Sequence, residues 1–224
     1  MNRPLVHRLA AEALGTALLV GTGTAAIVAT SSVGDGRFLW LAVAWFVAVS
    51  VPVFLFSSVS GAHLNPVVTL ALAVDRRVPT SEVPSHVAAQ FAGAFLGSGA
   101  VLAAFGPAHG LGATVPTAGD VVRALALEFL FTFALVAAVL ILVRRGAGPG
   151  RWRLLWPGAM VAVSTYVIGP WTGSSLNPAR TLAPAVLSGT YSDLWVYFVA
   201  PPLGALAAAG AVRLAERRRA RPHP

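Results

Sequence analysis

The feature that most constrains the fold of this chain is a run of 37 residues, Phe38 to Val74, without Asp, Glu, Lys or Arg. A helix that crosses a bilayer needs about 20 apolar residues, and two such helices with a turn need more than about 40. The run therefore predicts one membrane span and a further half-span, separated by the turn residues Ser57-Ser58-Val59-Ser60-Gly61. A second stretch, Leu154 to Val212, holds only the charges Arg180 and Asp193 and shows the same order of span, break, short apolar helix and span.

The composition is that of a membrane protein. Of the 224 residues, 56% are hydrophobic and 11% are charged, whereas a soluble domain is about 45–50% apolar and about 25% charged. A disordered chain would need the opposite bias. We therefore expect an all-α membrane protein with six transmembrane helices and two re-entrant half-helices. The spans are predicted at about 5–30, 38–57, 84–105, 121–143, 154–170 and 194–214, and the half-helices at 65–74 and 177–187.

The basic residues predict the orientation. All 16 are Arg, and with 8 acidic residues they give a formal net charge of +8. Thirteen lie at the start of the first span, after the first half-helix, between the fourth and fifth spans or at the end of the last span and beyond: Arg3, Arg8, Arg76, Arg77, Arg144, Arg145, Arg151, Arg153, Arg213, Arg217, Arg218, Arg219 and Arg221. The positive-inside rule then predicts a multi-pass protein of the cell (plasma or inner) membrane, with both termini in the cytoplasm and a basic tail on anionic lipid. This placement argues against a nucleic-acid partner.

The two halves of the chain share motifs at matching places. Ala11-Glu12-Ala13-Leu14-Gly15-Thr16 resembles Leu127-Glu128-Phe129-Leu130-Phe131-Thr132, and Gly61-Ala62-His63-Leu64-Asn65-Pro66-Val67 resembles Gly173-Ser174-Ser175-Leu176-Asn177-Pro178-Ala179. Three full spans per half is an odd number, so the halves enter the membrane from opposite sides. We expect an inverted repeat of residues 1–110, with half-helix 65–74, and residues 111–224, with half-helix 177–187 and the basic tail. Paired interrupted segments of this kind indicate a central permeation site.

Each Asn-Pro pair predicts the start of a half-helix inside the bilayer. Asn is a preferred N-cap, and Pro66 and Pro178 suit the first helical position, where a missing N–H costs nothing. With the halves inverted, the two positive helix N-termini face each other near the midplane and repel cations and protons. The side-chain oxygens of Asn65 and Asn177 cap backbone N–H groups, which leaves their NH2 groups to donate to a passing solute.

These motifs resemble those of the aquaporins, or major intrinsic proteins, over nearly the whole chain. The segments Leu182-Ala183-Pro184-Ala185 and Gly189-Thr190-Tyr191-Ser192-Asp193-Leu194-Trp195-Val196-Tyr197 look most like the nodulin-26-like, aquaglyceroporin-type branch and its bacterial relatives. Val67 departs from the family, which usually has Ala there, and could alter packing or local pore width. The resemblance implies the aquaporin fold, a homotetramer, and no cofactor.

The resemblance also implies a four-residue selectivity filter. Its spacing places Trp45 in the second span, Thr165 in the fifth, Ser174 in the second loop and Arg180 after the second Asn-Pro. Arg180 would donate to solute oxygens and exclude cations, although it could also be a structural or snorkelling Arg. The small Thr165 and an aromatic wall at Trp45 favour a pore wider than a strict water filter. The alternative is that Trp45 packs on lipid or core.

Other motif residues receive roles from the same resemblance. Glu12 and Glu128 would accept loop N–H groups and hold the loops in place, since no partner for catalytic carboxylates is evident. His63 is either a pore-lining donor or a loop brace. The remaining half-helix and pore-lining residues are expected to be Gly61, Ala62, Pro66, Val67, Gly173, Ser175, Pro178 and Ala179. The His residues form no metal-ligand spacing, and there is no cysteine.

The function that these patterns favour is a passive channel. We expect it to carry water and small uncharged solutes, such as glycerol or the metalloid hydroxides arsenous and boric acid, and to exclude ions and protons. One alternative is a water-selective aquaporin. A secondary transporter also has inverted repeats, but it would normally need ionisable groups at the midplane besides Arg180. No nucleophile–base pair, metal cluster or phosphate-binding loop indicates an enzyme.

Overall fold

The structure is a computed structural model that describes residues 3–144 and 151–219. In this part of the chain the regular elements are helices, eight α-helices and three short 3-10 helices. The long helices are α1 (Leu5–Ala29), α2 (Arg37–Phe56), α4 (Val83–Phe105), α5 (Val121–Arg144), α6 (Trp156–Thr172) and α8 (Val196–Arg219). The shorter elements are α3 (Pro66–Val74), α7 (Pro178–Ser188), η1 (Thr80–Glu82), η2 (Ala108–Gly112) and η3 (Arg151–Leu155).

The predicted six spans are confirmed. Within the described residues, six helical segments are long and apolar enough to cross a membrane, with mean hydropathy between 1.2 and 2.6. Between 22% and 50% of each such segment is buried inside the chain. Half or more of each span therefore faces outward, and large apolar side chains such as Leu14, Val122 and Leu130 are exposed there. A lipid environment makes such exposure favourable.

Two helix boundaries differ from the prediction. The fifth span, α6, begins at Trp156 rather than 154 and continues to Thr172, past Pro170. The last span, α8, runs to Arg219, so Arg213, Arg217 and Arg218 belong to a helix and not to a separate tail. A helix can outlast its apolar segment because polar residues form intrahelical hydrogen bonds equally well outside the bilayer. Arg145 and Arg221, used above to predict orientation, lie outside the described residues.

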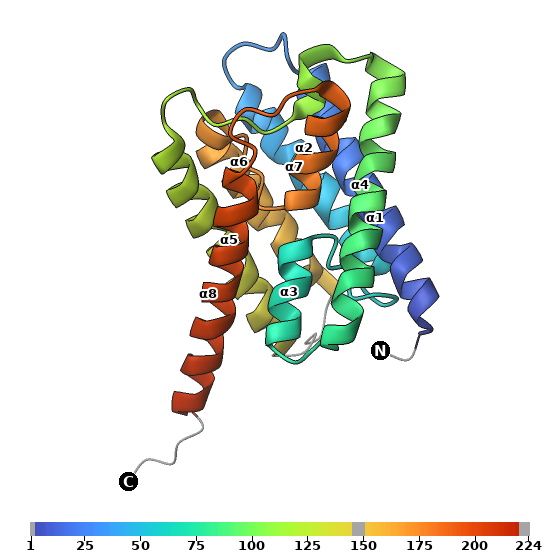
Figure 1. The fold of residues 1–224 in the computed structure, drawn as a ribbon, viewed down its shortest axis with the longest axis vertical. Coiled ribbons are helices and arrows are strands. Elements are labelled where there is room, and N and C mark those ends of the chain that lie inside the picture. The colour runs from blue at the N-terminus through green and yellow to red at the C-terminus, as the bar shows by residue number, and fades with distance from the viewer. Residues whose placement is uncertain (1–2, 145–150, 220–224) are drawn as a thin grey trace.

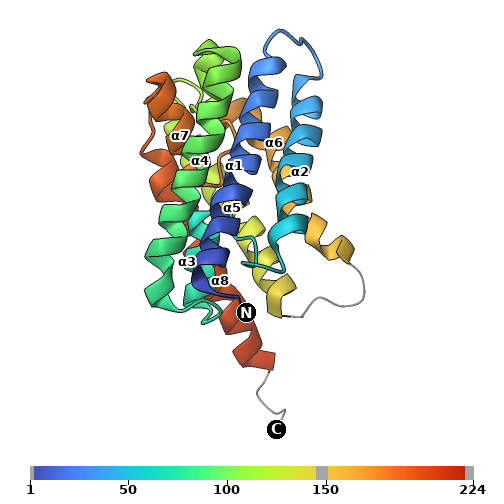
Figure 2. The same cartoon turned by 90° about the vertical axis from the view of Figure 1, so that its right-hand side faces the viewer.

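The spans form a bundle around the two half-helices. In Figures 1 and 2, α1 begins and α8 ends at the same end of the bundle, while α3 and α7 occupy opposite halves of its length. The closest helix pairs are α1 with α4 and α5 with α8, which occupy the same places in the two halves of the chain. A chain that crosses the membrane six times has both of its ends on the same side, which explains why α1 begins where α8 ends.

Glycines allow the closest of these helices to touch. A Cβ at Gly93 of α4 would lie 2.1 Å from the carbonyl oxygen of Ala13, and one at Gly97 would lie 2.4 Å from that of Ala17. Gly204 of α8 stands in the same relation to the carbonyl of Phe129, at 2.4 Å. Small residues four apart are typical of such helix contacts in membranes. Here they join helices of one chain.

Candidate functional site

Both half-helices begin at their Asn-Pro pair. The side-chain oxygen of Asn65 accepts from the N–H of Val67 at 3.0 Å, and that of Asn177 accepts from the N–H of Ala179 at 3.0 Å and of Arg180 at 3.4 Å. Both Asn residues have extended backbone, and a proline follows each at the first helical position. The short helices α3 and α7 thus start at these residues because the side chains satisfy N–H groups that a helix leaves unpaired.

The two Asn side chains also join the half-helices to each other. Asn65 Nδ2 donates to the carbonyl oxygen of Leu176 at 2.8 Å, and Asn177 Nδ2 donates to that of Leu64 at 2.9 Å. Each NH2 group has two N–H bonds, so one is used in this exchange and one is left. The sequence predicts that the whole NH2 group of each Asn is available to a solute. In the structure one of its two N–H bonds donates to the opposite loop, so only the other is available.

The loops before the half-helices have the same unusual backbone. Ala62 and Leu64 have φ of 50° and 51°, and Ser174 and Leu176 at the matching places have 49° and 52°. A non-glycine residue in this region costs about 1–2 kcal/mol. The alternation turns successive N–H groups to one side of the loop, which makes an anion-binding concavity.

A buried carboxylate occupies each concavity. Glu12 accepts from the N–H of His63 at 3.0 Å and of Leu64 at 2.7 Å. Glu128 accepts from the N–H of Ser175 at 2.8 Å and of Leu176 at 2.9 Å. Both carboxylates are 0% exposed. Charge-assisted hydrogen bonds therefore offset the cost of burying the carboxylates and hold the strained loops.

Hydroxyl and amide groups saturate the two carboxylates further. Ser60 Oγ donates to Glu12 at 2.6 Å, and Gln90 Nε2 donates to it at 2.7 Å. Thr172 Oγ1 donates to Glu128 at 2.7 Å. These contacts use the carboxylate oxygens that a proton relay or a coupled ion would need. They match the bracing geometry expected for Glu12 and Glu128.

A cavity of about 900 Å³ lies beside the meeting point of the half-helices. A water molecule in the liquid takes about 30 Å³, so the cavity can hold many small molecules. Its apolar lining residues include Leu19, Val49, Val53, Val68, Leu72, Leu135, Val139 and Val161. The loop Gly61-Ala62-His63-Leu64 and the polar residues Asn65, Ser175, Asn177 and Arg180 also line it. The lining therefore combines apolar side chains with polar groups.

The predicted site residues divide between this cavity and its surroundings. Those that line it are Trp45, Gly61, Ala62, His63, Asn65, Ser175, Asn177 and Arg180. Those that lie outside its lining are Pro66, Val67, Thr165, Gly173, Ser174, Pro178 and Ala179. Val67 packs into a buried cluster with Ala71 and Val136, so its extra methyl groups affect packing and not the cavity wall. Val68 and Leu72 also line the cavity but were not predicted to do so, although their spacing of four places both on one face of α3.

Arg180 and Trp45 both line the cavity and lie against each other. Arg180 is 1% exposed and Trp45 is 4% exposed. The guanidinium carbon of Arg180 lies 4.8 Å from the centroid of the Trp45 ring, within cation–π distance. Arg180 Nη1 donates to the carbonyl of Gly112 at 2.8 Å, while its buried Nε and Nη2 have no partner among the described residues. These two nitrogens leave N–H donors of a cavity-lining residue unused by the described residues.

A left-handed turn supplies the carbonyl that holds Arg180. His109, Gly110, Leu111 and Gly112 of η2 all have φ between 50° and 68°. Leu111, completely buried, packs beside Val28 and Val101 and anchors this turn. This turn was not predicted, although Gly110 and Gly112 at alternate positions permit a left-handed backbone.

The two remaining filter candidates are buried hydroxyl residues. Thr165 is 4% exposed, and its Oγ1 has no partner among the described residues. Ser174 Oγ pairs with Ser164 Oγ at 2.5 Å. Their assignment to the constriction rests on the spacing of the family motifs, since neither lies in the cavity lining.

His63 has contacts relevant to both roles considered for it, pore-lining donor and loop brace. Its backbone N–H donates to Glu12, and the residue is among those that line the cavity. The ring nitrogen Nδ1 lies 3.1 Å from Thr69 Oγ1, and the ring stacks on His86 with centroids 5.6 Å apart. Among residues 3–144 and 151–219, no group of three or more His, Cys, Asp or Glu could hold a metal ion.

The half-helices meet N-terminus to N-terminus among the six spans, and the cavity lies beside their meeting point. This arrangement is that of a transmembrane channel for small molecules. Its donors and apolar lining suit uncharged solutes. The chain belongs to the major intrinsic protein family, the aquaporins, whose family model matches residues 2–211. Members of this family are channels and not enzymes.

The relatives point to one branch of that family. The chain is 41% identical over 211 residues to aquaporin NIP1-3 of Oryza sativa subsp. japonica, with 93% of this chain and 73% of the relative covered. It is 35% identical over 208 residues to nodulin-26 of Glycine max, with 92% and 76% covered. A solved structure, the aquaglyceroporin from Plasmodium falciparum, matches with a TM-score of 0.79 and 25% identity over 92% of this chain and 95% of that one. The predicted resemblance to the nodulin-26-like branch is confirmed.

Proposed function

We propose that this chain is a passive channel for water and small uncharged solutes, including glycerol and metalloid hydroxides, with a filter of Trp45, Thr165, Ser174 and Arg180. The observation that carries this proposal is the contact between Arg180 and Trp45, which both line the cavity. The indole offers an apolar face to the carbons of a solute, and the unpaired guanidinium N–H groups can donate to its oxygens.

Exclusion of cations follows from the same geometry. Two half-helix N-termini with their partial positive charge meet near the Asn pair, and the charge of Arg180 lies close by. A cation entering this site would lose water and gain no carboxylate, because Glu12 and Glu128 face the loop N–H groups. A neutral solute exchanges hydrogen bonds with water for hydrogen bonds with Asn65, Asn177 and Arg180.

The water-selective alternative would have other residues at the positions of Thr165 and Trp45, and the difference in size is clearest at 165. A larger ring at position 165 would narrow the path, whereas the Thr165 hydroxyl is small and lacks a partner in the described residues. The transporter alternative is weaker, since the carboxylates of Glu12 and Glu128 are occupied by loop hydrogen bonds. The occupied carboxylates favour a channel over a transporter, and the small Thr165 side chain favours a wide filter.

A stopped-flow panel on one proteoliposome preparation tests the proposal. Water, glycerol, urea, boric acid and arsenous acid are each applied as an osmotic step, and vesicle volume is followed by light scattering. We expect non-saturating flux with a low activation energy for water and for at least one larger solute. Saturable, ion-coupled flux would contradict a channel, and flux of water alone would favour the water-selective alternative.

The assembly is part of the same proposal. We infer that residues 1–110 and 111–224 are the two inverted repeats, that the protein is a homotetramer in the cell membrane, and that both termini face the cytoplasm. The common end of α1 and α8 supports the last point together with the Arg distribution. Cross-linking in native membranes would test the tetramer by its subunit ladder.

A further inference from the structure

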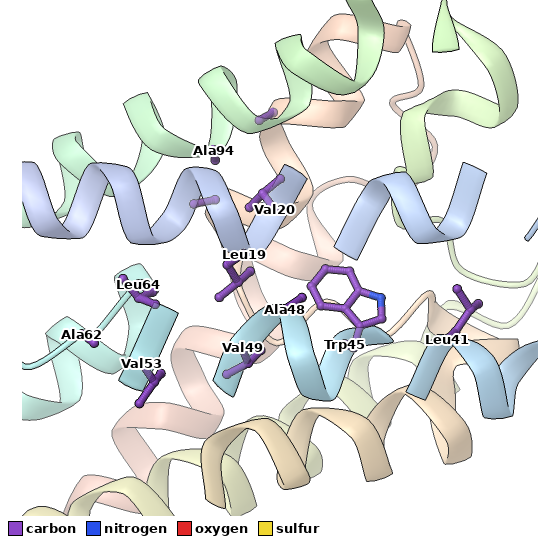
Figure 3. Packing of buried hydrophobic residues seen from close by; sticks show 12 residues of the cluster. Leu19, Val20, Leu41, Trp45, Ala48, Val49, Val53, Ala62, Leu64 and Ala94 are labelled. Atoms are coloured by element: carbon purple, nitrogen blue, oxygen red, sulfur yellow. The ribbon is translucent and has the colours of Figure 1, made fainter. Parts of the chain in front are cut away.

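Gly23 of α1 touches the indole ring of Trp45 on α2. A Cβ at Gly23 would lie 2.5 Å from Cη2 of the ring and 2.6 Å from both Cζ2 and Cζ3. Carbon atoms in contact stay about 3.5–4.0 Å apart. Figure 3 shows the ring in the space between the ribbons of α1 and α2. Any residue larger than glycine at position 23 would therefore displace the ring.

We propose that Gly23 is a positioning residue that sets the place of Trp45 and, through it, the width of the constriction at Arg180. This inference rests on the proposed function, in which Trp45 belongs to the filter. Gly23 itself is buried in α1 and is not among the residues that line the cavity. It acts through the ring.

Backbone conformation does not explain this glycine. Gly23 lies inside a regular helix and is absent from the residues with positive φ. A glycine there lowers helix stability relative to alanine. What the glycine provides is space for the Trp45 ring, and an alanine at position 23 would fill that space.

The surroundings of the ring determine the direction in which it would move. Val20, Leu41 and Ala48 belong with Trp45 to one buried cluster, and none of the three lines the cavity. The cavity and the Arg180 guanidinium, 4.8 Å from the ring centroid, lie beside it. A ring pushed away from α1 by about 1 Å, the shortfall from normal contact, moves toward the cavity because the packed side chains resist displacement. The path beside Arg180 then becomes narrower.

Another glycine of the same helix provides a matched control. A Cβ at Gly21 would meet Gly97 at 3.4 Å, which is an ordinary contact. Gly21→Ala therefore makes the same chemical change in α1 without touching Trp45. Trp45→Phe supplies the second control, because phenylalanine lacks the outer atoms of the indole that a Cβ at position 23 would meet.

The experiment is a double-mutant cycle in proteoliposomes. The readout is the permeability of the largest solute that the wild type conducts, divided by the water permeability. We expect Gly23→Ala to lower this ratio by about tenfold, the effect of one methyl group on a close-fitting site. Gly21→Ala leaves the ratio unchanged, and Gly23→Ala in the Trp45→Phe background changes it little, since the clash is gone.

The inference is overturned if a folded Gly23→Ala protein has an unchanged permeability ratio, or if Gly23→Ala lowers the ratio equally in the wild-type and Trp45→Phe backgrounds. If Gly23→Ala alone fails to fold, we expect the added Trp45→Phe change to restore the folded protein, as judged by a single elution peak in detergent. A double variant that also fails to fold would overturn the inference as well. A wild type that conducts none of the solutes would instead contradict the proposed function.

Discussion

At the scale of single residues, the guanidinium of Arg180 has, in the described part of the chain, one nitrogen that is hydrogen-bonded and two that are not. Nη1 is held by the Gly112 carbonyl, the guanidinium lies over Trp45, and Nε and Nη2 have no partner among the described residues. The hydrogen bond of Nη1 orients the guanidinium without using all of its N–H donors. The orientation of this guanidinium therefore depends on a contact from a loop 68 residues away in the sequence.

Replacing Arg180 by Val tests this charge. The change removes the cation, so we expect proton and cation leak through the pore to rise by about tenfold or more, equal to at least about 1.4 kcal/mol of barrier. A pH-sensitive dye inside proteoliposomes measures the leak, and water flux in the same vesicles shows that the variant is folded. Unchanged exclusion in such a variant would reduce Arg180 to a structural role.

Replacing Thr165 by His tests the predicted width of the filter. The imidazole adds volume where the small threonine side chain lies, so glycerol or arsenous acid flux should fall by about tenfold while water flux falls less. Thr165→Ser is the matched control, because it keeps the hydroxyl and adds no bulk. Equal loss of all fluxes would mean that position 165 lies outside the constriction.

At the scale of elements, what could be predicted depends on how locally each element is determined. The starts of α3 and α7 follow from Asn-Pro alone, because a cap and a proline specify a helix N-terminus within a few residues. The exchange of hydrogen bonds between Asn65 and Leu176 and the left-handed turn at His109–Gly112 join distant segments. No local pattern encodes such pairs, so the contacts that shape the site emerge only from the folded chain.

Two arginines hold the C-terminal end of α3. Arg144 of α5 makes a two-fold contact with the carboxylate of Asp75, whose side chain is 3% exposed, and also pairs with Glu216 of α8. Arg213 of α8 donates to the carbonyl of Val74 at 2.8 Å. Cations at a helix C-terminus offset its partial negative charge. The half-helix is thus fixed at its N-terminus by Asn65 and at its other end by these residues.

Replacing Arg144 by Met tests this clamp. It leaves Asp75 buried without its main partner, so we expect the folded protein in detergent to lose about 3–5 kcal/mol of stability. Asp75→Asn added to Arg144→Met should recover part of this loss. Glu216→Ala should cost less than about 1 kcal/mol because that side chain is 52% exposed. Thermal unfolding followed by loss of monodisperse elution ranks the variants, and equal effects of all three would contradict the clamp.

At the scale of the whole molecule, the prediction that remains to be tested is which end of the bundle faces the cytoplasm. The chain contains no cysteine, so one introduced cysteine gives an unambiguous label. Ser32, between α1 and α2, and Thr80, at the start of η1, are both exposed and lie at opposite ends of the first helices. The predicted topology assigns thirteen of the 16 Arg residues to the side of Thr80, so the positive-inside rule predicts that this side faces the cytoplasm. A membrane-impermeant maleimide should label Ser32→Cys in intact cells and Thr80→Cys only after permeabilisation. The reverse pattern would contradict the orientation, and labelling of both in intact cells would mean that the chain inserts in two directions.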